Sequence, residues 1–233
     1  MQINTAMLTK LNIKVNQTEL ELATRAIDYS WFKISFNKPT KSFFYDPWVI
    51  KEEFKNTVWD KLLSYLPMDI GEARLILLQP GNCYNSHSDI DDRYHLNIVG
   101  NYSFLVNIDD ATMYKTVADC YWYEMDAGPR HSAVNYGEVV RAQLVVRKLL
   151  KSNALEHPIS LAISPNDIPI DDARYIFDDT VSIWLNRAVK NGIVMNFNYN
   201  PTSGEVSFDV EYKFVNDVLN LIPPTFKVIH GYK

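Results

Sequence analysis

Five short apolar segments in the middle of the chain decide its fold: ARLILL (73–78), YHLNIVG (94–100), YSFLVNI (102–108), CYWYEM (120–125) and EVVRAQLVVRKLL (138–150). Each has the length and the β-branched or aromatic content of a strand, and clusters such as Pro80-Gly81-Asn82 and Asp126-Ala127-Gly128-Pro129 mark turns between them. Because the spacing leaves no room for long helices, we expect antiparallel strands in a mainly β sandwich or barrel.

Two segments ahead of this β-rich region have helical spacing, at residues 17–28 and 47–66. In the second segment, apolar residues recur at steps of three and four from Val58 to Leu66, and Pro67 ends the predicted helix. The sequence therefore predicts N-terminal helices that flank the β domain, and we assign residues 1–150 to this first domain.

The remaining residues, 151–233, are expected to form a small α+β appendage. Its predicted elements are a linker or irregular strand at 160–170, a helix at 177–191, a hairpin of 193–199 and 206–212, and a short helix at 214–221. Its two histidines, His157 and His230, have no partner at metal-ligand spacing. We therefore expect the chemistry of the protein to lie in the first domain.

The composition excludes several classes of protein. The chain has 233 residues and a net charge of −5, and its basic runs never exceed two residues, which argues against binding to nucleic acid. Two cysteines, Cys83 and Cys120, are too few for a disulfide framework. With no signal-peptide pattern and no apolar run of about 18 residues, we expect a cytoplasmic protein that acts on a small-molecule or peptide substrate. The sequence indicates no oligomeric state.

Three residues have the types and spacing of a metal site: His87, Asp89 and His131. His87 and Asp89 are two residues apart, so on a strand both side chains would leave the same face. Two imidazoles and one carboxylate form the facial triad of non-heme Fe(II) oxygenases, which leaves further metal positions open. Zinc or another divalent ion can use the same ligands and is the main alternative to iron.

A fourth residue, Arg141, lies inside the apolar run Val139–Val146. A charged side chain in a segment that is predicted to be a buried strand needs an anionic partner. A dicarboxylate cosubstrate would supply that partner, and so would an Asp or Glu of the protein in a structural ion pair.

The segment from Gln79 to Arg147 resembles the 2-oxoglutarate/Fe(II) oxygenases, within them the aspartyl/asparaginyl β-hydroxylase-like branch. The resemblance depends on the HxD motif at His87, on Pro80-Gly81 before it, on Arg93-Tyr94-His95 after it, and on the ten-residue step from His131 to Arg141. It covers about a third of the chain and does not extend to the residues after 150.

The resemblance implies a double-stranded β-helix, the jelly-roll fold of cupins, with Fe(II) on His87, Asp89 and His131 and 2-oxoglutarate as cosubstrate. Arg93 and His95 would then lie near the cosubstrate carboxylate beside the metal, and Arg141 would bind the distal carboxylate. The implied reaction is hydroxylation of an unactivated C–H bond, with an amino-acid side chain, free or in a peptide, as the expected substrate.

The chain departs from the branch at two positions. Asp89 stands where the best-known members have glycine, which favours a complete three-ligand site, and Ile76 stands near the position of a serine that helps to hold the distal carboxylate. Arg93 has an alternative role in an ion pair with Asp91 or Asp92. Asn135 has two expected roles, a ligand or cosubstrate contact and a turn.

Two other functions fit the same residues. One is a cupin-type hydrolase or isomerase that uses another metal in the three ligands. The other is a binding or structural module that retains the metal site, with residues 151–233 as its interaction surface.

Overall fold

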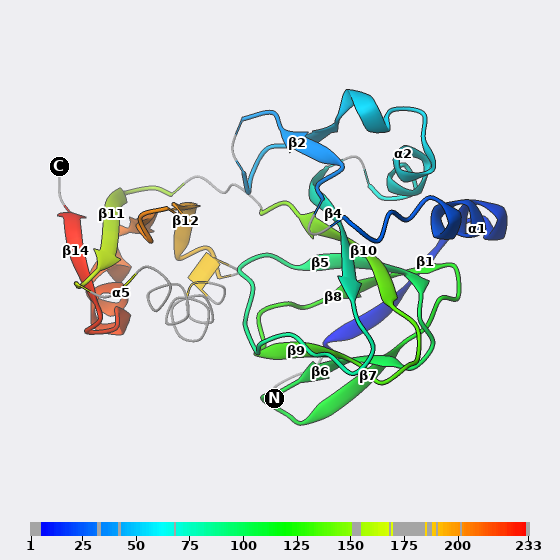
Figure 1. Cartoon of the computed structure of the whole chain (residues 1–233). Helices are drawn as coiled ribbons and strands as arrows, with labels where there is room; N and C mark the ends of the chain where they lie inside the picture. Colours follow the sequence, from blue (N-terminus) through cyan, green and yellow to red (C-terminus); the bar gives the residue numbers. More distant parts are fainter. Residues whose placement is uncertain are drawn as a thin grey trace. The chain divides into compact units, whose positions relative to one another are not determined.

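The computed structural model describes residues 6–31, 34–41, 43–67, 69–150, 155–167, 169, 185, 188–189, 191–200 and 202–231. The chain divides into two compact units (Figure 1). The first comprises Met1–Ser86 and Asp91–Leu149, and the second comprises Leu150–Lys233 together with the short segment His87–Ile90. Among the described residues, none of the helices combines the length and the apolar character that crossing a membrane requires.

The first unit contains a five-stranded antiparallel sheet. Its strands are β1 (Leu8–Lys14), β4 (Ile70–Leu78), β5 (Arg93–Val99), β8 (Tyr121–Met125) and β10 (Arg141–Lys148), in the spatial order β1-β8-β5-β10-β4. Strand β10 pairs with β5 on one side and with β4 on the other. It is therefore an inner strand of the sheet, with its backbone groups engaged on both sides.

A second, three-stranded sheet consists of β6 (Ser103–Asn107), β7 (Thr112–Thr116) and β9 (His131–Asn135), in the order β7-β6-β9. Cys83 forms an isolated antiparallel bridge with Val134 of β9, in the position that a fourth strand of this sheet would take. Except for the β6–β7 hairpin, consecutive segments thus alternate between the sheets, with β4, β5, β8 and β10 in one and Cys83, β6, β7 and β9 in the other. This strand order is that of a double-stranded β-helix, so the predicted fold is confirmed.

The two predicted N-terminal helices differ in how well they match the structure. The first is α1 (Gln17–Arg25), which begins after Asn16 because the Asn16 Oδ1 accepts a hydrogen bond of 2.8 Å from the Thr18 N–H. The second, expected at 47–66, is confined to α2 (Val58–Leu63).

Strand pairing explains why the second helix is short. Residues Trp48–Ile50 form β3, which pairs with β2 (Asn37–Pro39), and Glu52–Phe54 form a single 3₁₀ turn. The prediction of a helix from residue 47 was wrong, because backbone hydrogen bonds to a partner distant in sequence outweigh local helical spacing.

The main apolar core lies on the outer face of the five-stranded sheet, against α1 and α2 (Figure 1). Side chains alternate along a strand, so every second residue of β5 and β10 faces this core. Leu96 of β5 and Leu144 of β10 are fully buried there, together with Leu62 of α2. The helices therefore cover one face of the sheet.

The opposite, inner face of the same strands is polar. Arg93, His95 and Asn97 of β5 alternate with the core residues, as do Arg141 and Gln143 of β10, and all five are buried. A smaller apolar cluster on this side joins the two sheets; its buried members are Met7, Leu78, Leu105, Met125, Ala127 and Ala133. Polar groups buried in this way need hydrogen-bonding partners, so a ligand-binding site is expected in the interior of the β-helix.

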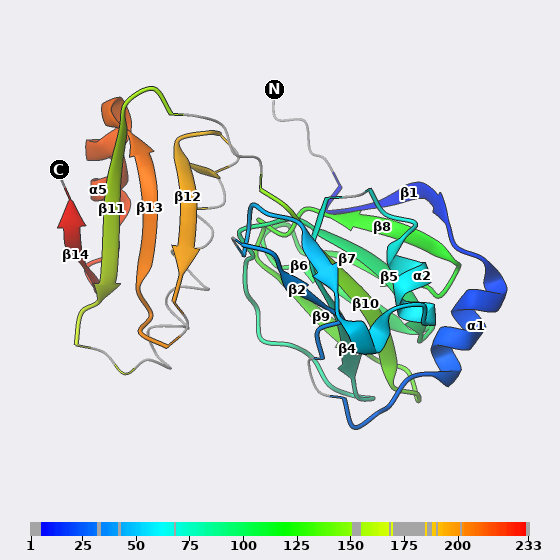
Figure 2. The ribbon, with the colours of Figure 1, turned by 90° about the horizontal axis from the view of Figure 1, so that it is seen from above.

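The second unit is an antiparallel sheet of four strands, β11 (Pro158–Pro165), β12 (Val194–Tyr199), β13 (Val206–Glu211) and β14 (Phe226–Gly231), in the order β12-β13-β11-β14 (Figure 2). A 3₁₀ turn at Tyr212–Phe214 leads into α5 (Val215–Leu221). The predicted α+β character, the hairpin and the short last helix agree with this arrangement.

Two other predictions in this region had different outcomes. The segment 160–170, expected as a linker or irregular strand, is regular strand β11 as far as Pro165. The helix expected at 177–191 falls mostly outside the described residues, of which Leu185, Ala188 and Val189 are helical.

The apolar core predicts a large effect of a single truncation in β10. Replacement of Leu144 by Ala should lower the free energy of unfolding by about 2–5 kcal/mol, because the inner strand cannot move to fill the cavity. The matched control is Leu22→Ala on α1, where the side chain is 48% exposed and little should change. Urea denaturation of both variants measures the difference, and equal losses would contradict this placement of the core.

Candidate metal centre

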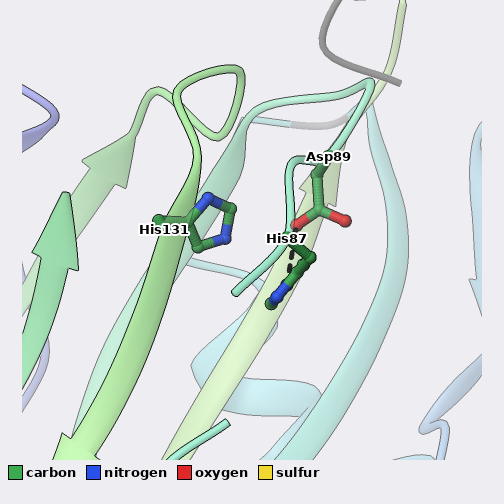
Figure 3. A group of neighbouring side chains, drawn as sticks. All are labelled: His87, Asp89 and His131. Carbon is green, nitrogen blue, oxygen red and sulfur yellow. Dashed lines mark ion pairs between the residues drawn. The ribbon is translucent and has the colours of Figure 1, made fainter. Parts of the chain in front are cut away.

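The side chains of His87, Asp89 and His131 come together beside strand β9, with His131 buried and the other two partly exposed (Figure 3). His131 is the first residue of β9, and it is buried on the face that also carries Ala133 of the inner apolar cluster. His87 and Asp89 lie in the segment between β4 and β5, outside the named strands. The expectation that a regular strand holds this pair was therefore wrong, although the two side chains still approach the same point.

The three side chains form a group that is able to hold a metal ion. One ligand atom from each residue lies within 4.8 Å of the others, and His87 Nε2 is 3.9 Å from Asp89 Oδ2. Ligand atoms that bind one ion at about 2.0–2.2 Å are roughly 3 Å apart when adjacent. Small side-chain rotations would bring the group to that spacing, and its nitrogen and oxygen donors suit a divalent transition metal.

The orientation of His131 is set by a backbone carbonyl. Its Nδ1 lies 2.9 Å from the Pro129 carbonyl oxygen, which can only accept a hydrogen bond. Nδ1 therefore carries the proton, and the lone pair on Nε2 is the one able to bind a metal. Such a second hydrogen bond fixes the tautomer and the ring direction of metal-binding histidines.

Among the described residues, the buried guanidinium of Arg141 has no carboxylate partner. Its side chain donates one hydrogen bond, from Nη2 to Oε1 of the neutral Gln143, while Nε and Nη1 have no hydrogen-bond partner within the described part of the chain. Burial lowers the pKa of Arg141 to about 10, which still leaves the guanidinium charged at neutral pH. The structural ion pair that was the alternative role for Arg141 does not occur among the described residues.

Arg93, in contrast, pairs with a carboxylate. Its Nη1 forms a buried ion pair with Asp91, and the other Asp91 oxygen lies 2.7 Å from Nη1 of Arg147. This pairing is the alternative role of Arg93, although the pair is buried rather than exposed. It fixes the chain two residues after Asp89 and thereby helps to position that ligand.

His95 is buried and uncharged. Its ring nitrogens form no hydrogen bond of standard geometry among the described residues, although the Gln143 side chain lies close enough to raise its pKa. Burial is the main cause that lowers the pKa of His95 to about 3, and the charges of Arg141, Arg93 and His131 act in the same direction. A neutral imidazole offers one donor and one acceptor to a molecule inside the β-helix.

The side chain of Asn135 is already fully engaged with the backbone. Its Nδ2 donates to the carbonyl oxygens of Leu78 and Val139, both at 2.9 Å, and its Oδ1 accepts a hydrogen bond of 3.0 Å from the Gly137 N–H. These contacts hold the turn before β10 against the end of β4. Of the two expected roles of Asn135, they favour the turn.

Gln143 is a site residue that the sequence reasoning did not single out. It lies two residues after Arg141 on the same face of β10 and contacts the Arg141 guanidinium. A signal for it was present, because Arg141 and Gln143 are polar at alternate positions of an otherwise apolar run.

Comparisons with known proteins give only distant structural likenesses. No family model and no curated protein matches the chain. A solved cupin domain from Bordetella pertussis Tohama I is 11% identical, with 37% of this chain and 88% of that chain covered and a TM-score of 0.32. The capsular polysaccharide assembling protein CapF from Staphylococcus aureus is 15% identical, with 43% of this chain and 38% of that chain covered and a TM-score of 0.29.

Structural similarity at these TM-scores does not establish the class of the protein. The class is therefore assigned from the strand order. The chain is a mainly β protein with a cupin-like double-stranded β-helix and a His-Asp-His group that could hold a metal ion.

Removal of any one ligand should cost metal affinity. His87→Ala, Asp89→Ala and His131→Ala should each weaken Mn(II) or Fe(II) binding by more than the roughly 10–100-fold that loss of an outer partner causes. His157→Ala is the control, since that side chain is 78% exposed and does not belong to the metal-binding group. Isothermal titration with the metal measures the effect, and unchanged affinity in His131→Ala would exclude this site.

The burial of His95 predicts a pH-dependent stability. Its folded pKa of about 3 lies below an unfolded value near 6.5, so the unfolded state binds more protons between these limits and stability falls as the pH drops. Metal-free wild type should lose about 2 kcal/mol more than His95→Gln between pH 7 and pH 5. Urea denaturation at both pH values tests this, and parallel losses would show that His95 is not buried in its neutral form.

Proposed function

We propose that this protein is an Fe(II)- and 2-oxoglutarate-dependent oxygenase that hydroxylates an unactivated C–H bond. The observation that carries the proposal is the charged guanidinium of Arg141, which is 3% exposed, has no carboxylate partner among the described residues, and lies on the inner face of the sheet. Burial of an unpaired charge is costly. A site that retains such a charge is best explained by a ligand that brings an anion.

The residues fit a metal and a dicarboxylate together. His87, Asp89 and His131 would hold the iron, and Arg141 would bind the distal carboxylate of 2-oxoglutarate through a guanidinium N–H group without a partner among the described residues, on Nη1 or on Nε. Each charge-assisted hydrogen bond would contribute roughly 1.5–3 kcal/mol.

His95 lies near both Arg141 and His131, so it could contact a ligand that is bound between them. The charges of Arg141 and His131 both lower its pKa, so it is close to both. We assign His95 the contact with the keto acid end beside the metal. Arg93, which is paired with Asp91, would hold the ligand-bearing segment in position rather than bind the cosubstrate directly.

When bound, an Fe(II)–2-oxoglutarate centre supplies the oxidising power to insert oxygen into a C–H bond, with succinate and carbon dioxide as products. The chain itself orients the cosubstrate through Arg141 and His95 and excludes water from the buried end of the site. The resemblance to the aspartyl/asparaginyl β-hydroxylase-like branch suggests an amino-acid side chain, free or in a peptide, as the substrate.

The rival functions give different results in one assay. Purified protein is reconstituted with Fe(II) in the absence of oxygen, mixed with 2-oxoglutarate and then exposed to oxygen, and succinate is measured. Succinate above the level of His131→Ala supports the oxygenase. A cupin-type hydrolase or isomerase, or a binding module, would bind metal and form none, and that result would overturn the proposal.

Arg141→Leu should weaken 2-oxoglutarate binding on the order of 100-fold, because roughly 2–3 kcal/mol of charge-assisted hydrogen bonding is lost. Metal affinity should stay the same, since Arg141 is not a ligand. Anaerobic calorimetric titration of the metal-loaded protein measures both constants, with Arg25→Leu, an exposed position on α1, as control. Unchanged 2-oxoglutarate affinity in Arg141→Leu would remove the cosubstrate role from this residue.

A further inference from the structure

A series of hydrogen-bonded side-chain amides extends from Arg141. The Arg141 Nη2 donates to Gln143 Oε1, the Gln143 Nε2 donates to Asn97 Oδ1 at 2.6 Å, and the Asn97 Nδ2 donates to the Val117 carbonyl oxygen at 3.2 Å. Gln143 and Asn97 are 1% and 3% exposed, and they are cross-strand neighbours in the pairing of β10 with β5.

The groups at the two ends of this hydrogen-bonded series fix the orientation of both amides in the same sense. The Val117 carbonyl can only accept a hydrogen bond, so Asn97 must turn its NH₂ group to Val117 and its oxygen to Gln143. The Arg141 guanidinium can only donate, so Gln143 must turn its oxygen to Arg141 and its NH₂ group to Asn97. Neither amide can flip without leaving buried donors or acceptors unpaired, which makes the arrangement rigid.

The identity of residue 143 decides the net charge beside Arg141. The other fully buried arginine, Arg93, is matched by the carboxylate of Asp91. Arg141 is instead matched by an amide, which fixes its direction but leaves its positive charge uncompensated. On β4 the residue opposite Gln143 is Ile76, which has no polar group with which to hold an anion.

We propose that Gln143, held by Asn97, is the residue that selects for a ligand with a second carboxylate, because it orients the Arg141 guanidinium without neutralising it. This inference rests on the proposed function, since it assumes that Arg141 binds the distal carboxylate of the cosubstrate. Gln143 is a positioning residue, and its effect on the ligand passes through Arg141. A carboxylate at position 143 would neutralise the positive charge of Arg141 that binds the ligand. It would also repel the second carboxylate of the ligand.

The test compares two substitutions at this position with two ligands. Gln143→Glu nearly preserves the shape and adds a charge, whereas Gln143→Leu removes both hydrogen bonds and adds none. The ligands are 2-oxoglutarate and 2-oxopentanoate, which has the same keto acid end and lacks the second carboxylate. Affinities are measured by anaerobic titration of the full-length, Mn(II)-loaded protein, and thermal denaturation shows that each variant is folded.

For 2-oxoglutarate, Gln143→Glu should lose on the order of 100-fold in affinity and Gln143→Leu only about 10-fold, the latter because Arg141 keeps its charge but loses one orienting bond. For 2-oxopentanoate, Gln143→Glu should match the wild type. A purely structural role predicts the reverse order, since Gln143→Leu breaks more hydrogen bonds, and it predicts equal losses for both ligands.

The outcomes separate the two proposals. If Arg141→Leu loses 2-oxoglutarate while Gln143→Glu binds it as well as the wild type, the selecting role of Gln143 is refuted and the proposed function stands. If the wild type binds neither ligand, or Arg141→Leu binds both normally, the proposed function fails and this inference fails with it.

Discussion

The structure depends on the burial of strand β10 on both of its faces. Its backbone pairs with β4 and β5, so no edge is free, and its side chains alternate between two very different surroundings. Leu144 and Val146 join the apolar core beneath the helices, whereas Arg141 and Gln143 face the interior of the β-helix. Because the side chains of a strand alternate between its two faces, a shift of one residue in register would place Arg141 in the apolar core. The same shift would place Leu144 in the polar interior. The fold and the polar interior are thus specified by the same eight residues.

Within that interior, two buried arginines are handled in opposite ways. Arg93 is paired with the carboxylate of Asp91, which also contacts Arg147, and this pairing holds the chain after Asp89. Arg141 has a neutral partner, and the neutral His95 near it adds no compensating charge. Of these two arginines, Arg141 is therefore the one without a carboxylate partner among the described residues.

The sequence predicted the strands whose burial gives them an apolar pattern, and it missed those without one. Strand β7 is largely exposed, and three of the five residues of β9 are polar. The metal-binding group was predicted from residue types and spacing, but His87 and Asp89 lie outside the named strands, beyond the residues Gly81–Tyr84 whose backbone pairs with β9. The contacts of Asp91 with Arg147 and of Gln143 with Asn97 join residues far apart in sequence. Such contacts depend on strand register, which local patterns do not encode.

The separation of the apolar core from the polar interior has an evolutionary consequence. In most small domains the residues that stabilise the fold and those that contact a ligand share one core, so a change of ligand risks the loss of the fold. Here the main apolar core lies on the outer face of the five-stranded sheet, and only a smaller apolar cluster shares the inner face with the polar residues. Mutations of the inner polar residues can therefore change which ligand is bound without disturbing the main apolar core. The core residues under the helices can vary separately, under selection for packing alone. A lineage built on this sheet can diversify its ligands without first acquiring extra stability.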